Sequence, residues 1–136
     1  MDLSDLERLR ESNRLEVKAA QGGLPKDVWP SVSAFANTNG GLIVLGVKEN
    51  TKTHELFVLG LKDAHKMLDD FVNAANSADK LSYPIVSGEH LSIQTIRGRE
   101  VIAIEVPRAE REQRPIYLGR DPLNGTYRRT FVGDYH

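Results

Sequence analysis

The amino-acid sequence predicts an α+β fold, with two to three helices packed on one face of a mixed, mostly antiparallel sheet. Two segments, ending near Ala36 and Ser77, carry apolar residues at helical spacing. The run Leu42–Val47 is continuously apolar, which is typical of a central strand buried on both faces. Further short runs alternate apolar and polar residues between glycine-containing turns, which indicates hairpins. We expect residues 1–136 to form a single domain, the N-terminal fragment of a longer protein, because the chain stops just after its last predicted strand.

The elements before the central strand are short. A capping box over Ser4–Glu7 opens a helix that ends near Arg10. The segment Leu15–Lys18 alternates, so we expect a strand with its two apolar side chains facing inward and Glu16 and Lys18 facing outward.

A helix, a sharp turn and a strand then follow one another directly. We expect Asp27 to cap the helix and Asn37–Asn39 to end it. Gly40-Gly41 can adopt the positive φ needed to reverse the chain. The buried strand that follows would deliver Lys48 and Glu49 to the rim of the core.

The second half of the sequence predicts strands, one helix and a charged loop. In chain order, we expect a strand over 55–59, a helix over 62–77, a strand over 83–87, a hairpin over 91–106, a charged loop over 107–114 and a last strand over 126–131.

Composition and charge exclude several classes of protein. The chain has no cysteine, which rules out disulfides and thiolate metal sites, and it has no apolar run near the roughly 20 residues of a membrane helix. The N-terminus lacks the apolar region of a signal peptide, so we expect a cytoplasmic protein without a membrane partner. Its 18 basic and 19 acidic residues give a net charge of −1, so any attraction to nucleic acid must be local.

Arginines are concentrated in the last third of the sequence. Guanidinium groups bind phosphate well, and neighbouring tyrosines could stack on bases. The alternative is a salt-bridged surface, because Glu110 and Glu112 lie among the arginines of the charged loop. The residues predicted to contact phosphate are Lys18, Arg108, Arg111, Arg114, Arg128 and Arg129.

Three glutamates could form an acidic site. Glu11 and Glu16 flank the start of the first strand, and Glu49 ends the central one. If the two strands are neighbours, the three carboxylates could hold Mg²⁺ or Mn²⁺ and activate water for phosphodiester cleavage. In the alternative, all three are solvated surface acids, or Glu16 pairs with Lys18 or Arg14.

A phosphate-binding loop is not expected. The segment Gly41–Lys48 is close to a Walker pattern, but its lysine comes one position late and no Ser or Thr follows. The residues between its glycines form a hydrophobic strand, which cannot present backbone N–H groups as a loop does.

Several segments together resemble the Schlafen AlbA_2 domain, also called the divergent AAA-4 domain. A Tyr-x-Arg strand followed by a Val-Gly turn, near the end of the chain, fits the same pattern. The segments are ESNRLEVK at Glu11–Lys18, LPKDVWPSVSAFANTNGGLIVLGVKEN at Leu24–Asn50, LFVLGL at Leu56–Leu61, and the later RPIYL and NGTYRRTFVGDY.

This resemblance implies a nucleic-acid-binding α+β module of a bacterial transcriptional regulator or helicase-related protein. Animal Schlafen proteins clamp RNA between two related lobes, and a single lobe would need a homodimer or another domain to do so. Some of them cleave tRNA with two glutamates and an aspartate; the glutamates fall on Glu11 and Glu16, and Glu49 stands at the aspartate position. The leading hypothesis is therefore a DNA- or RNA-binding module. The alternatives are a metal-dependent endoribonuclease and a protein-interaction or dimerisation domain.

Overall fold

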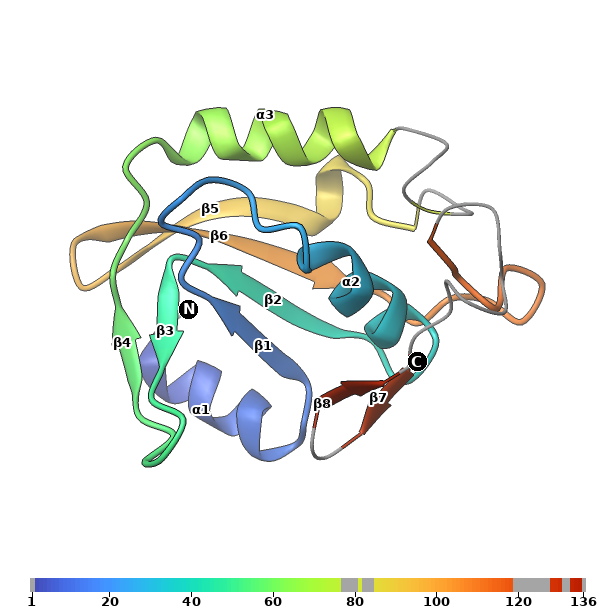
Figure 1. Ribbon diagram of the computed structural model, residues 1–136, viewed down its shortest axis with the longest axis horizontal. Coiled ribbons are helices and arrows are strands. Elements are labelled where there is room, and N and C mark those ends of the chain that lie inside the picture. Colours follow the sequence, from blue (N-terminus) through green and yellow to red (C-terminus); the bar gives the residue numbers. More distant parts are fainter. Residues whose placement is uncertain (1, 77–80, 82–84, 119–127, 131–132, 136) are drawn as a thin grey trace.

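The computed structural model describes residues 2–76, 81, 85–118, 128–130 and 133–135. Within this part of the chain, three α-helices and one short 3₁₀ helix accompany the strands (Figure 1). The α-helices are α1 (Leu3–Glu11), α2 (Val28–Ala36) and α3 (Ala64–Ala75), and the 3₁₀ helix is Gly88–His90. The strands are β1 (Leu15–Lys18), β2 (Gly41–Leu45), β3 (Val47–Glu49), β4 (Leu56–Val58), β5 (Leu91–Ile96), β6 (Arg99–Val106), β7 (Arg128–Thr130) and β8 (Gly133–Tyr135).

A four-stranded sheet of order β1-β2-β6-β5 forms the centre of the fold. β1 runs parallel to β2, whereas β6 is antiparallel to both β2 and β5. This confirms the predicted α+β class with a mixed, mostly antiparallel sheet. β2 is central as predicted, and its neighbour β1 places Glu16 opposite Ile43.

Helices cover both faces of this sheet. This confirms the prediction that the central strand is buried on both faces, and makes the prediction that the helices lie on one face wrong. Alternate residues of β2 belong to different cores: Ile43 and Leu45 pack with α2 and α3, whereas Leu42 and Val44 pack with Leu6 of α1. A strand covered on both faces reads as a continuous apolar run, because every side chain is buried.

The predicted strand over Leu42–Val47 is divided at Gly46. This residue has a φ of 106°, a conformation that favours glycine, and its N–H donates to the carbonyl of Lys18. After it, β3 leaves the sheet and pairs only with β4, as a separate hairpin. Glu49 therefore lies on this hairpin, away from the end of the central strand.

Helix α1 begins two residues earlier than predicted. The cap is Asp2 rather than Ser4, and a capping box joins Asp2 to Asp5. The hydroxyl of Ser4 donates to Oδ1 of Asp2 at 2.6 Å. This bond, followed by the bond from the Asp5 N–H, lowers the pKa of the Asp2 carboxyl.

The hairpin of β5 and β6 is confirmed. Its two turn residues, Arg97 and Gly98, both have positive φ, as a type I′ turn requires. The strand predicted over 83–87 lies partly outside the described residues, and residues 85–87 are not in a strand. The strand predicted over 126–131 appears as β7, which pairs with an additional strand, β8.

No helix in the described ranges is long and apolar enough to cross a membrane.

Candidate nucleic-acid interface

The charged loop, residues 107–118, leaves the sheet at the end of β6. It is drawn in orange in Figure 1, at the end of the molecule opposite the β3–β4 hairpin and the β5–β6 turn. Its start lies against the Gly40-Gly41 turn: a Cβ on Gly40 would lie 2.7 Å from the carbonyl oxygen of Val106 and 3.1 Å from the N of Arg108. Gly40 also has a φ of +73°, so both its conformation and its surroundings favour glycine.

Helix α2 holds the loop at two points. The first is a hydrogen bond of 2.8 Å from the N–H of Ala109 to the carbonyl of Ala36. The second is Asn37, whose side chain donates to the Ile116 carbonyl and accepts from the Ile116 N–H, both at 2.7 Å. Ser33, which is fully buried, also donates to the Ile116 carbonyl, at 2.7 Å.

Between these points the loop folds on itself. The N–H groups of Gln113 and Arg114 both donate to the carbonyl of Glu110, at 2.9 and 3.2 Å. The side chain of Gln113 in turn accepts from the N–H of Glu110, at 2.9 Å. The backbone that carries the three arginines is therefore fixed both by its own turn and by α2.

The three loop arginines carry charge that the neighbouring acids do not pair. Arg108 and Arg111 are exposed, and Arg114 is half-buried. Within the described ranges, none of the three forms an ion pair with Glu110, Glu112 or any other carboxylate. Three arginines and two glutamates give residues 107–118 a net charge of +1. The predicted charged loop is confirmed, and within the part of the chain that the structure describes its three arginines are not salt-bridged.

We predict that Asn37→Ala lowers the free energy of unfolding by about 2 kcal/mol, because it leaves the buried N–H of Ile116 without its partner. Urea denaturation checks this. Asn39→Ala is the matched control, since Asn39 is exposed, and it should change stability by less than about 0.5 kcal/mol. Equal stability of the two variants would show that the Asn37 bridge does not hold the loop.

Ser33 and Asn37 were missed as site residues in the sequence. They lie four residues apart, on one side of a helix whose other residues are almost all buried and apolar. A pair of small polar residues at this spacing is the signal that could have indicated a bonded partner. The partner itself is 79 residues from Asn37 and has no local sequence signature.

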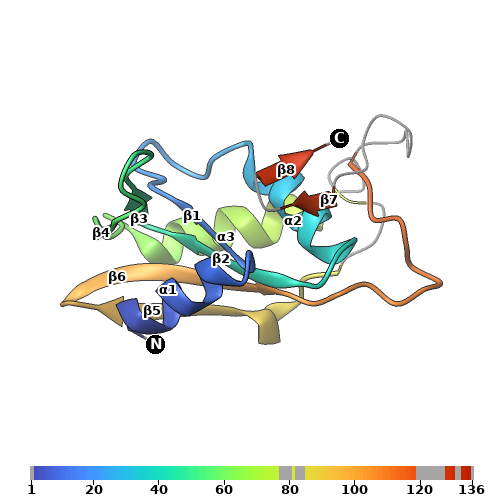
Figure 2. The ribbon, with the colours of Figure 1, turned by 90° about the horizontal axis from the view of Figure 1, so that it is seen from below.

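The remaining predicted basic residues are placed differently. Arg128 and Arg129 lie on β7, which packs beside α2 in the same half of the molecule as the loop (Figure 2); their side chains are outside the described part of the structure. Lys18 is only 10% exposed, and its ammonium lies 3.3 Å from the carboxylate of Asp27. The prediction that Lys18 faces solvent is wrong, because its side of β1 is the side covered by α2.

The three predicted acidic residues are not brought together. Glu11 is the exposed last residue of α1. Glu16 lies opposite Ile43, on the sheet face that α2 and α3 cover. Glu49 reaches toward α1, which covers the other face. Among the described residues no group of three or more His, Asp or Glu side chains could hold a metal ion, so these carboxylates do not fit a shared Mg²⁺ or Mn²⁺ site.

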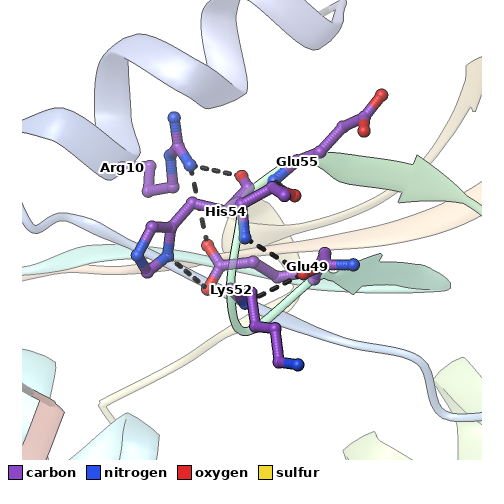
Figure 3. Close-up of polar contacts among 7 residues, drawn as sticks. Arg10, Glu49, Lys52, His54 and Glu55 are labelled. Carbon is purple, nitrogen blue, oxygen red and sulfur yellow. Dashed lines mark hydrogen bonds and ion pairs between the residues drawn. The ribbon is translucent and has the colours of Figure 1, made fainter.

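Glu49 instead belongs to a small polar cluster that joins the β3–β4 hairpin to α1 (Figure 3). Its carboxylate lies 4.0 Å from a guanidinium nitrogen of Arg10 and 3.9 Å from Nδ1 of His54. Arg10 also donates to the carbonyl of His54. The hairpin loop itself is closed by Asn50, whose side chain accepts from the N–H groups of Lys52 and Thr53. These contacts place the carboxylate of Glu49 between α1 and the loop of its own hairpin.

Comparison with protein-family models matches residues 11–131 to the family described as Schlafen, AlbA_2. Among solved structures, the chain is similar to the N-terminal domain of a RecG-related candidate ATP-dependent DNA helicase from Nitrosomonas europaea. The TM-score is 0.66 at 27% sequence identity, over 94% of this chain and 85% of that one. The fold is also similar to that of the DIP2311 protein from Corynebacterium diphtheriae, with a TM-score of 0.58 and 17% identity; the match covers 98% of this chain but 29% of that one. A comparison with curated proteins finds no match.

Proposed function

This chain belongs to the Schlafen, AlbA_2 family, and we propose that it is a nucleic-acid-binding module that contacts backbone phosphates through the loop of residues 107–118. The observation that supports this proposal most is the set of three loop arginines. They have no ion-pair partner among the described residues, and their backbone is fixed by α2. A fixed backbone lowers the entropy lost on binding, and free guanidinium groups are suited to phosphate.

The similarity to a domain of a candidate DNA helicase supports a nucleic acid as the ligand. We propose further that the module serves a transcriptional regulator. Its sequence preference should be weak, because contacts to phosphate position a protein without reading bases. A second copy of the chain could supply the other half of a clamp. Light scattering with and without nucleic acid would show whether the chain dimerises when it binds.

The test of the proposed function is equilibrium binding, by fluorescence anisotropy, to a labelled DNA duplex and a labelled single-stranded RNA. We expect binding to at least one of them, and affinity should fall steeply between about 50 and 200 mM salt. Affinity that does not change with salt, or no binding to either probe, would rule the function out. The probe that the chain binds with the higher affinity identifies DNA or RNA as the preferred ligand.

The predicted endoribonuclease activity has its own test. Glu16 lies on the sheet face that α2 and α3 cover, whereas Glu49 contacts α1 on the other side. We therefore expect the wild type and Glu16→Gln to cleave tRNA at the same rate, if at all, in Mn²⁺ or Mg²⁺. Glu105→Gln, an exposed glutamate on β6, is the matched control. Cleavage that is lost in Glu16→Gln but kept in Glu105→Gln would instead establish the acidic site.

A further inference from the structure

Arg114 differs from the other two loop arginines in one respect. Its Nε is buried and has no hydrogen-bond partner among the described residues. Buried N–H groups without a partner are rare, because they lose their bonds to water and gain nothing in return. In this loop the unpaired donor belongs to the residue type best suited to bind phosphate.

The backbone of Arg114 is held on both sides. Its own N–H donates to the carbonyl of Glu110 at 3.2 Å, and two residues later Ile116 is bonded to Asn37 and Ser33. The guanidinium, in contrast, makes no hydrogen bond or ion pair within the described ranges. An outward turn of the side chain would therefore break no polar contact with the described residues, and the backbone that carries it would stay fixed.

We propose that Arg114 is the residue of this loop that binds a backbone phosphate of the nucleic acid as a fork, that is, through two parallel hydrogen bonds from Nε and one Nη. The planar guanidinium presents two parallel N–H groups, which match two phosphate oxygens, and lysine cannot reproduce this geometry. Binding satisfies a donor that has no partner among the described residues of the free protein. Arg108 and Arg111, which are exposed, then add attraction that depends mainly on charge. This inference rests on the proposed nucleic-acid binding.

The experiment compares Arg114→Lys with Arg111→Lys by anisotropy on the same DNA duplex and single-stranded RNA. Both variants keep the charge of the loop, so a purely electrostatic role predicts equal affinities. We expect Arg114→Lys to weaken binding about 10-fold, through the loss of one charge-assisted hydrogen bond, and Arg111→Lys to weaken it less than about 2-fold. If the wild type binds but the two lysine variants bind equally well, the fork is wrong and the proposed function stands. A wild type that binds neither probe overturns both.

Thermal unfolding supplies a second readout that needs no ligand. Arg114→Met removes the unpaired donor and keeps the length of the side chain, so its Tm should equal that of the wild type or exceed it by about 3 °C. Arg111→Met is the control and should not change Tm. A fall of more than about 5 °C in Arg114→Met would show that the guanidinium stabilises the fold, and it would overturn the assignment.

Discussion

Replacing all three loop arginines with glutamine should lower the affinity for nucleic acid about 100-fold or more at about 50 mM salt. Each guanidinium that contacts a phosphate releases counterions on binding, and this release is worth most when salt is low. The described residues contain no carboxylate paired with Arg108, Arg111 or Arg114, so none of the three charges is neutralised by an ion pair within that part of the chain. Glutamine keeps most of the stem of each side chain, so the loop should remain on α2.

A matched variant separates a local interface from a general effect of charge. Lys48, Lys52 and Arg97 are also exposed, and they lie on the β3–β4 hairpin and the β5–β6 turn, at the opposite end of the molecule (Figure 1). Replacing these three with glutamine changes the net charge by the same amount. We expect it to weaken binding less than about 5-fold. Equal losses in the two triple variants would mean that the loop is not the binding surface.

Gly41→Ala should destabilise the fold by about 3 kcal/mol. A Cβ at this position would lie 2.3 Å from two ring atoms of Phe35, which is 1% exposed and part of the core beneath α2. The ring cannot move away, because the interior around it is closely packed. The added methyl group would therefore push the start of β2 away from the end of α2, next to the attachment of the arginine loop.

Urea denaturation of Gly41→Ala measures this cost, and Gly22→Ala provides its control. A Cβ on Gly22 meets no atom within 4 Å, and Gly22 has no positive φ, so its replacement should change stability by less than about 0.5 kcal/mol. A Gly41→Ala variant as stable as Gly22→Ala would show that the close approach of this turn to Phe35 is not a constraint on the sequence.

Much of the local structure could be predicted because it depends on neighbouring residues. The apolar run that begins at Leu42 predicted a central strand, and the turn at Arg97-Gly98 predicted the β5–β6 hairpin; both are confirmed. The family resemblance also pointed to the family whose model matches residues 11–131. In each case the pattern lies within one segment.

The rest depends on contacts between distant segments, and the sequence carries little information about those. The continuous apolar run indicates that both faces of β2 are buried, but it does not show which segments cover them, so the prediction that all helices lie on one face is wrong. For the same reason, the alternation of apolar and polar residues in β1 predicts that Glu16 and Lys18 lie on the opposite face from its two apolar residues. It does not show that α2 covers the face on which Glu16 and Lys18 lie. The bond between Asn37 and Ile116 joins residues 79 positions apart.

The most direct test of the interface is the salt dependence of binding for the wild type and the triple variant Arg108, Arg111 and Arg114→Gln. A plot of log affinity against log salt concentration has a slope of about −0.9 for each phosphate contact on duplex DNA and about −0.7 on a single strand. We predict that the slope of the triple variant is less negative than that of the wild type by about 2 to 3, whereas the variant of Lys48, Lys52 and Arg97 has the same slope as the wild type. A wild type and an arginine-loop variant with the same slope would contradict the account, because the loop would then make no phosphate contacts.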